Sequence, residues 1–203
     1  IPMVFVIAEG GGIRAAYWSA GILSSLQESL DNFDSHLFGL SGASGGSIGI
    51  TLYTTLLARS PDGRYPDYVK GILKNDFLSP ILAGMFTREM VQLVLPTGIQ
   101  SLDRAKVFEK AWERAWEKEL GDNTLASPFT RLWVEESSPR PDEKSELPSL
   151  FLNSVNVESG APSVVSNLQL DMADTVIQVF YDTTPSMKDI PVSTAFHLSA
   201  RFP

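Results

Sequence analysis

Two short apolar runs, each followed by a glycine-rich turn and a longer amphipathic stretch, open the chain. Residues 3–9 (MVFVIAE) are rich in β-branched side chains and end at three glycines, which predicts a buried strand entering a loop. Residues 13–30 then place apolar side chains at roughly helical spacing. Residues 36–40 predict a second strand, and residues 44–58 a helix of small residues. This order is typical of a parallel sheet with crossover helices.

The middle of the chain predicts further helices and polar loops. Residues 103–120 show the clearest helical pattern, and each Lys or Arg on one side has a Glu nearby. That pairing favours a solvated helix with ion pairs over a phosphate-binding ridge. Residues 60–66 are rich in Pro and Gly and predict a loop. Residues 77–96 are apolar but interrupted, which predicts a partly buried helix pair or, alternatively, a lid or interfacial helix beside a lipid site.

The last third predicts two strands and a helix. Residues 150–160 and 176–183 have strand patterns, and residues 191–203 predict a helix with Pro at its start and exit. Residues 135–148 are charged and rich in Pro and Ser, which is typical of a surface loop or insertion. We therefore expect one α/β domain over residues 1–203, with a possible lid or interfacial helical segment at 60–100.

Charge and composition exclude several classes of function. The 203 residues carry a net charge of −8, which argues against general binding to nucleic acid. The chain has no Cys, and its two His lie far apart, so we expect no metal site and no cofactor. No apolar run is long enough to span a bilayer, and no targeting signal is present. Because the first residue is not Met, we expect the natural protein to begin earlier, with a membrane-associated or cytoplasmic location favoured.

The second glycine-rich turn, residues 42–46, matches the pattern G-x-S-x-G around Ser44. In this pattern a serine occupies a strained turn between a strand and a helix, and its neighbours must be small for the backbone to fold back. The turn exposes the hydroxyl at a helix N-terminus, where the dipole favours developing negative charge. The predicted strand before Ser44 and the predicted helix after it supply the required context. Ser44 is thus a candidate nucleophile.

The first turn, Gly10-Gly11-Gly12, permits two interpretations. Together with Ala15 it formally matches the dinucleotide fingerprint G-x-G-x-x-G/A. That fingerprint needs an acid at the end of the second strand, whereas Asp31 and Asp34 precede that strand. Alternatively, the glycines bring backbone N–H groups close to an oxyanion formed at Ser44. Ends of adjacent parallel strands lie side by side, so both turns would then form one site.

These two turns resemble those of the patatin-like phospholipase family, α/β acyl hydrolases with a Ser–Asp dyad. The resemblance lies in GGGIRAAYW and GASGGS, and in the later segments LFLNSVNVESG and STAFHLSARFP. It implies a three-layer patatin-like sandwich with a mostly parallel central sheet, incomplete at the C-terminal end. It further implies that Ser44 is the nucleophile and that Gly10, Gly11, Gly12 and Gly45 line the oxyanion hole. Arg14 would bind substrate phosphate or hold the loop, with a structural salt bridge as the alternative.

One family feature is absent from the chain. The family's acid lies in a D-G-[GA] motif after the segment that resembles ARFP, but this sequence stops at Pro203. The resemblance therefore places the catalytic Asp beyond Pro203, in the remainder of a longer parent chain. His197 lies among apolar helix residues and is expected to be structural rather than a base. The acids without any motif around them are Asp171, Asp174, Asp182 and Asp189.

The resulting hypothesis is a serine hydrolase that cleaves ester bonds of phospholipids or other lipids through an acyl-enzyme. The expected partners are a lipid or other acyl-ester substrate and a membrane surface. The missing acid keeps open a non-catalytic lipid- or protein-binding module on the same scaffold, in which case this chain alone would be inactive. The dinucleotide-binding domain is the third and least favoured hypothesis.

Overall fold

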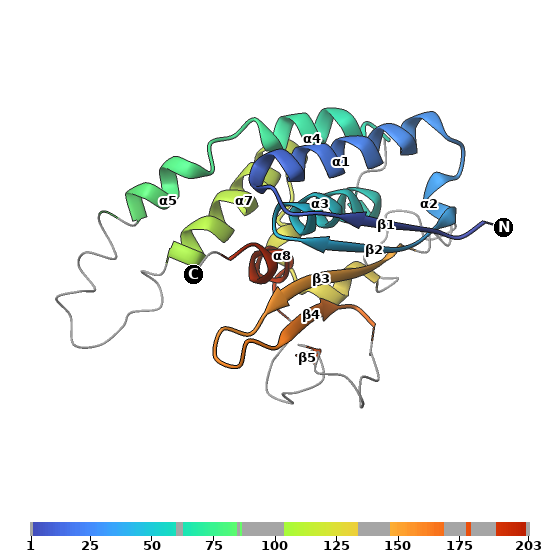
Figure 1. Ribbon diagram of the computed structural model, residues 1–203. Coiled ribbons are helices and arrows are strands. Elements are labelled where there is room, and N and C mark those ends of the chain that lie inside the picture. The colour runs from blue at the N-terminus through green and yellow to red at the C-terminus, as the bar shows by residue number, and fades with distance from the viewer. Residues whose placement is uncertain are drawn as a thin grey trace.

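The computed structural model describes residues 2–59, 63–84, 86, 104–133, 147–168, 178–179 and 190–201, and it shows one sheet with helices packed against it (Figure 1). The strands are β1 (Val4–Ala8), β2 (Leu37–Ala43), β3 (Ser149–Val155), β4 (Pro162–Ser166) and β5 (Gln178–Val179). The helices are α1 (Gly12–Ser29), α2 (Phe33–His36), α3 (Gly45–Arg59), α4 (Tyr65–Leu73), α5 (Leu78–Gly84), α7 (Arg104–Leu120) and α8 (Val192–Ala200), with 3-10 turns η3 (Thr124–Ala126) and η4 (Phe129–Trp133). Most of these elements match the predicted ranges to within a few residues.

The five strands form one sheet in the order β1-β2-β3-β4-β5. Strand β2 pairs in parallel with both β1 and β3, and β4 pairs in parallel with β5. Only the β3–β4 pair is antiparallel. Parallel strands need long crossovers, and α1 provides the crossover from β1 to β2. The predicted α/β class with a mostly parallel sheet is confirmed.

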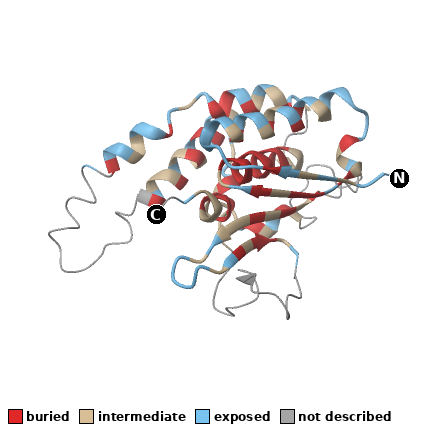
Figure 2. Cartoon of the chain, viewed as in Figure 1, coloured by how far each residue is buried: buried red, intermediate tan, exposed pale blue. Residues whose placement is uncertain are grey.

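Helix α3 lies at the centre of the molecule and is almost entirely buried (Figure 2). It contacts β1, β2 and β3 on one side and α1 and α4 on the other. Helix α1 can approach α3 closely because residue 49 is a glycine: a Cβ there would lie only 2.6 Å from the carbonyl oxygen of Ala16. Ala16 and Ala20 present only methyl groups to this contact, and both are fully buried. Such packing holds the start of α3 rigidly against the sheet.

The two faces of the sheet differ near β1. Gly42 faces α3, because a Cβ there would lie 2.7 Å from the backbone nitrogen of Ser47. Its partners in register on the neighbouring strands, Ala8 and Leu152, are buried as well. On the opposite face, Phe5 and Ile7 are 61% and 80% exposed. The described helices therefore cover one face of the sheet at this edge.

Two local features depart from the sequence analysis. The predicted strand at 150–160 ends at Val155 as β3, because the side chain of Asn156 accepts hydrogen bonds from the backbone N–H groups of Glu158 and Ser159 and closes a turn that leads to β4. Gly160 completes this turn with a φ of 68°. The predicted loop at 60–66 ends earlier than expected, since Pro66 stands in the first turn of α4. Proline fits that position because the first N–H groups of a helix have no partner within it.

The predicted lid at 60–100 covers several different structures. Helix α4 is part of the core, with Val69 and Ile72 buried. Helix α5 exposes Leu78 and Leu82, whereas residues 87–103 lie outside the described residues. Most of the predicted surface loop at 135–148 also lies outside them. None of the helices that the structure describes is both long and apolar enough to cross a membrane.

Candidate active site

The serine turn, Gly42–Gly46, lies where β2 ends and α3 begins. Ser44 has a φ of 51°, in the left-handed region that a residue with a side chain rarely adopts. Its carbonyl oxygen accepts a hydrogen bond of 3.3 Å from the N–H of Ile48, in the first turn of α3. Ser44 is half-buried, so its side chain stands at the helix N-terminus with access to solvent. This strained strand-to-helix geometry is that of the predicted turn.

The glycines of the serine turn are required by the neighbouring backbone. A Cβ on Gly45 would lie 2.0 Å from the carbonyl oxygen of Gly12, and one on Gly46 would lie 2.3 Å from that of Ala8. A Cβ on Gly10 would in turn lie 3.4 Å from the Cβ of Ser44. The glycine loop, Gly10–Gly12, therefore presses directly against the serine turn. The structure brings together the two turns that the sequence analysis assigned to one site.

The glycine loop leads straight into α1. Gly12 has a φ of 60° and is the first residue of that helix, so its conformation favours glycine. Gly10, Gly11 and Arg14 are all exposed, with Arg14 in the first turn of α1. Arg14 forms no ion pair with another described residue. The described residues therefore give no support to the alternative that Arg14 serves in a structural salt bridge.

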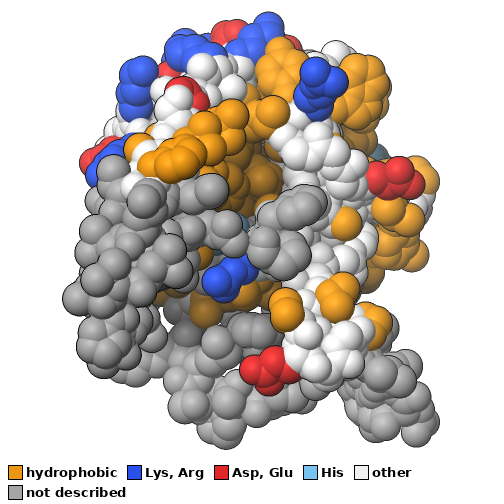
Figure 3. Space-filling model, turned by 60° about the vertical axis from the view of Figure 1, so that its left-hand side comes forward, with side chains coloured by type: hydrophobic (Ala, Val, Ile, Leu, Met, Phe, Trp, Pro, Cys, Tyr) orange, Lys and Arg blue, Asp and Glu red, His pale blue; other side chains and the backbone are white. Residues whose placement is uncertain are grey.

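A groove of about 700 Å³ begins at the glycine loop and continues between β1 and α1. Its polar end consists of Glu9, Gly10, Gly11 and Arg14. Its remaining walls are mainly apolar: Val6, Ile7, Ala8, Ala15, Trp18, Ile22, Leu23 and Leu26, with Ser19. Figure 3 shows the side of the molecule toward which β1 and β2 end, where many hydrophobic side chains are exposed. A groove of this composition can hold a molecule with a polar end and an apolar tail.

Asn153 and Ser199 also contact the serine turn, although neither was proposed from the sequence. The side-chain amide of Asn153 donates hydrogen bonds of 2.9 Å to Ser41 Oγ and to the carbonyl oxygen of Gly42. Ser199 Oγ accepts a hydrogen bond of 3.1 Å from the N–H of Ser44. These partners are more than 100 positions apart in the sequence, so no local pattern marks them. Polar residues at the end of β3 and of α8 are the only sequence signal.

His197 is held in a structural contact. It is 8% exposed, and its Nδ1 lies 3.2 Å from Glu109 Oε1. Lys106 donates a second hydrogen bond of 2.6 Å to Glu109. Burial on its own raises the pKa of Glu109, but these hydrogen bonds from His197 and Lys106 outweigh it and hold the pKa below its usual value. These contacts support the structural role expected of this histidine.

No acid in the described residues pairs with the candidate nucleophile. None of the described carboxylates forms a hydrogen bond with Ser44, and Asp171, Asp174, Asp182 and Asp189 lie outside the described residues. Asp31 and Asp34 precede β2, at the opposite end of the sheet from the glycine loop (Figure 1). The acid that a dinucleotide site would require beside that loop is thus not supplied by either of them. Among described side chains, no group of three or more His, Asp or Glu is arranged to hold a metal ion.

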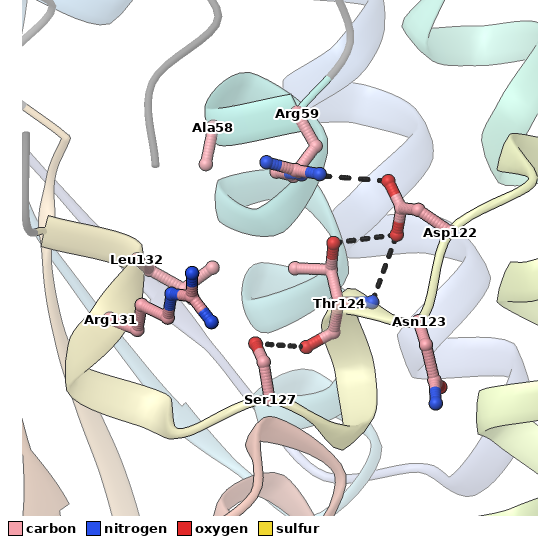
Figure 4. A pocket seen from close by; sticks show the side chains of 8 residues that line it. All are labelled: Ala58, Arg59, Asp122, Asn123, Thr124, Ser127, Arg131 and Leu132. Atoms are coloured by element: carbon pink, nitrogen blue, oxygen red, sulfur yellow. Dashed lines mark hydrogen bonds and ion pairs between the residues drawn. The ribbon is translucent and has the colours of Figure 1, made fainter. Parts of the chain in front are cut away.

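A second polar pocket, of about 270 Å³, lies at the other end of α3 (Figure 4). Asp122 accepts hydrogen bonds from Trp116 Nε1, the Thr124 N–H and the Thr124 hydroxyl, at 2.7, 2.9 and 2.6 Å. Arg59 Nε lies 3.5 Å from its other carboxylate oxygen. Burial raises the pKa of Asp122, but the hydrogen bonds from Thr124 and Trp116 outweigh it and keep the pKa below its usual value. None of the predicted site residues lines this pocket.

The chain was compared with known protein families, sequences and structures. The family described as patatin-like phospholipase matches residues 6–203. No curated protein sequence matches the chain. Among solved structures, human GIVD cytosolic phospholipase A2 in complex with methyl gamma-linolenyl fluorophosphonate aligns with 82% of the chain at 20% identity and a TM-score of 0.45. The ExoU–SpcU complex from the type III secretion system of Pseudomonas aeruginosa aligns with 100% at 16% identity and a TM-score of 0.45. The chain spans only 23% and 36% of the lengths of these two proteins.

Proposed function

The chain belongs to the patatin-like phospholipase family, and on that premise we propose that it carries the nucleophile half of a serine hydrolase that cleaves carboxylic ester bonds of phospholipids or related lipids. The observation that carries this proposal is the left-handed backbone of Ser44, with the glycine loop packed against it. Strained backbone conformations of this kind persist where the surrounding structure imposes them, and they cluster at active sites. The tight contacts of Gly45 and Gly46 with the backbone of Gly12 and Ala8 hold the serine turn against the end of β1 and the loop that follows it.

In the proposed reaction, Ser44 Oγ attacks the ester carbonyl carbon and a tetrahedral oxyanion forms. The N–H of Gly45 and the N–H groups of Gly10–Gly12 stabilise this oxyanion, assisted by the N-terminus of α3. The acid that accepts the serine proton is proposed to be the family's Asp beyond Pro203. The proton passes to the leaving alcohol as the ester C–O bond breaks, which leaves an acyl-enzyme on Ser44. A water molecule then attacks this ester and releases the fatty acid.

The groove beside the glycine loop supports a lipid substrate. Arg14 lies at its polar end, where a cation suits a lipid phosphate. Trp18 and Ile22 lie farther along it and suit an acyl chain. Association of the natural protein with a membrane surface belongs to the same proposal, because a phospholipid ester is normally reached at a bilayer.

The test is fatty-acid release from phosphatidylcholine vesicles by the natural protein that contains this chain. Ser44→Ala is expected to lower the rate by about a thousandfold or more, as loss of a nucleophile does. Ser127→Ala is the matched control, since this serine lines the second pocket, and its rate should stay near that of the natural protein. Unchanged hydrolysis by Ser44→Ala would contradict the proposal. Vesicle binding without hydrolysis by the natural protein would instead support the binding module.

A further inference from the structure

The hydroxyl of Ser199, near the end of α8, connects three separate elements. It donates a hydrogen bond to the carbonyl oxygen of Asn153 on β3. It accepts one of 3.1 Å from the N–H of Ser44 and lies 2.7 Å from Ser47 Oγ on α3. A serine hydroxyl has one hydrogen and two lone pairs. Because its hydrogen goes to Asn153, Ser47 must donate the third bond, and the hydrogen-bonding capacity of Ser199 is then complete.

In this arrangement the backbone N–H of Ser44 already has a hydrogen-bond acceptor, the hydroxyl of Ser199. Since this group is engaged with Ser199, it is not directed at an oxyanion formed on the nucleophile. Stabilisation of that oxyanion is then left to Gly45 and the glycine loop, which already lie in contact. The bond to Ser199 also restrains Ser44 at its φ of 51°, a backbone conformation that persists only where its surroundings impose it.

The end of α8 is itself firmly attached to the sheet. Ser154 Oγ donates a hydrogen bond of 2.7 Å to the carbonyl oxygen of Leu198, the residue before Ser199. Asn153, which receives the Ser199 hydroxyl, also holds Ser41 and Gly42 through its side chain. Ser199 is half-buried among these groups. Its hydroxyl therefore has a fixed position from which it can restrain the serine turn.

The geometry points to Ser199 as a positioning residue that holds Ser44 in its reactive conformation through the backbone N–H. This inference rests on the proposed function, because it names a residue that supports the same nucleophile. Ser199 touches no reacting atom in this scheme. Its contribution is to keep the serine turn in place against the glycine loop, and small displacements of a nucleophile lower the rate of reaction steeply.

The test uses three variants of the natural full-length protein. Ser199→Ala removes the hydroxyl, and Ser199→Thr retains it. Ser193→Ala is the matched control, because Ser193 lies on the same helix and donates its hydrogen bond to Glu113, away from the serine turn. Two quantities are measured for each variant. The first is kcat and KM for ester hydrolysis, and the second is the hydrogen-exchange rate of the Ser44 backbone amide.

Ser199→Ala is expected to lower kcat by about ten- to a hundredfold with little change in KM, because binding of substrate is not altered. The Ser44 amide should exchange about tenfold faster once its acceptor is gone. Ser199→Thr should restore both quantities to nearly natural values. Ser193→Ala should alter neither, which separates positioning of Ser44 from general loosening of α8.

Unchanged kcat and unchanged Ser44 exchange in Ser199→Ala would overturn the inference, as would an equal effect of Ser193→Ala. If the natural protein hydrolyses no ester, the proposed function fails, and amide exchange alone decides the role of Ser199. If Ser199→Ala does not fold, exchange in the natural protein decides instead. The Ser44 amide should then be protected by about a hundredfold or more relative to an unstructured peptide, and exchange at the unstructured rate would refute the bond.

Discussion

The two ends of helix α3 differ in how the chain is held there: by close contacts of strained backbone at one end and by a cluster of polar side chains at the other. At its N-terminal end, the chain accepts a left-handed serine and places glycines where any side chain would strike backbone. At its C-terminal end, Arg59 lies in a cluster where Asp122 receives hydrogen bonds from Trp116 and Thr124. The C-terminal end borders a pocket, and the glycine loop that packs on the N-terminal end borders a groove; charged side chains line both cavities. Among the described residues, the strained serine and the tight main-chain contacts lie at the first end.

The two ends of α3 differ in the strain of the backbone rather than in the presence of polar side chains. Polar side chains that satisfy one another stabilise a fold and need no further explanation. A strained backbone costs free energy, so it is retained where the surrounding structure and the function require it. For this reason the serine turn is the candidate active site, although the pocket at Asp122 also holds hydrogen-bonded polar side chains.

The largest expected effect comes from adding one methyl group at the serine turn. Gly45→Ala would place its Cβ 2.0 Å from the carbonyl oxygen of Gly12, and backbone cannot yield as a flexible side chain does. We expect a loss of about 3 kcal/mol in the free energy of unfolding, together with loss of ester hydrolysis. Chemical denaturation and fatty-acid release measure the two effects. A stable and active Gly45→Ala protein would show that the two turns do not pack as described.

A smaller effect on stability, with none on reactivity, is expected at the other end of α3. Asp122→Ala removes the acceptor of three hydrogen bonds and should lower the free energy of unfolding by about 2 kcal/mol. Reaction of Ser44 with a fluorophosphonate should continue at the natural rate, measured by intact mass at a temperature where the variant is folded. A marked loss of that reactivity would mean that the two ends are coupled.

The third prediction concerns pH and the support beneath α8. The pKa of Glu109 is lowered from 4.5 in the folded protein, so this group stabilises the fold above that value and loses its contribution as the pH falls through the lower, folded pKa. Glu109→Gln should therefore be less stable than the natural protein at neutral pH. The difference in Tm between the two should shrink as the pH falls below 4.5.

The control for this pH dependence lies on the same helix. Glu117 is exposed, so Glu117→Gln should differ little in Tm from the natural protein at any pH. If the difference in Tm between Glu109→Gln and the natural protein stayed constant from neutral to acidic pH, the ionised Glu109 would not stabilise the fold through its contact with His197.

The smallest effect is expected at a glycine outside the site. A Cβ on Gly21, within α1, would meet nothing within 4 Å. Gly21→Ala should therefore raise the free energy of unfolding by about 0.5–1 kcal/mol, because alanine favours the helix. Chemical denaturation measures this gain, and ester hydrolysis should be unaffected. A loss of stability similar to that of Gly45→Ala would remove the distinction between the two positions.

The sequence predicted the parts of this molecule whose causes are local. The two glycine turns, the strands before them and the helices after them were recognisable, because strand pattern, turn residues and helix spacing occur within about 20 positions. Those features sufficed to propose Ser44 and Gly10–Gly12 as one site. The structure bears out their proximity, whereas their catalytic roles remain predictions.

The parts that the sequence did not predict depend on distant contacts or on ambiguous local residues. Ser199 reaches Ser44 across 155 positions, and nothing near either residue indicates that contact. The turn between β3 and β4 was missed because the alternation of apolar and polar residues in β3 continues through Val157. Pro66 suggested a loop, although proline is equally suited to the first turn of a helix. In each case tertiary contacts or capping decided between alternatives that the local pattern left open.

The most direct test of the central claim is the intact mass of the natural protein before and after treatment with a fluorophosphonate, with Ser44→Ala and Ser127→Ala alongside. We predict a single adduct on the natural protein and on Ser127→Ala, mapped to Ser44, and none on Ser44→Ala. An adduct that persists in Ser44→Ala, or a folded natural protein that hydrolyses lipid without any adduct at Ser44, would contradict the account.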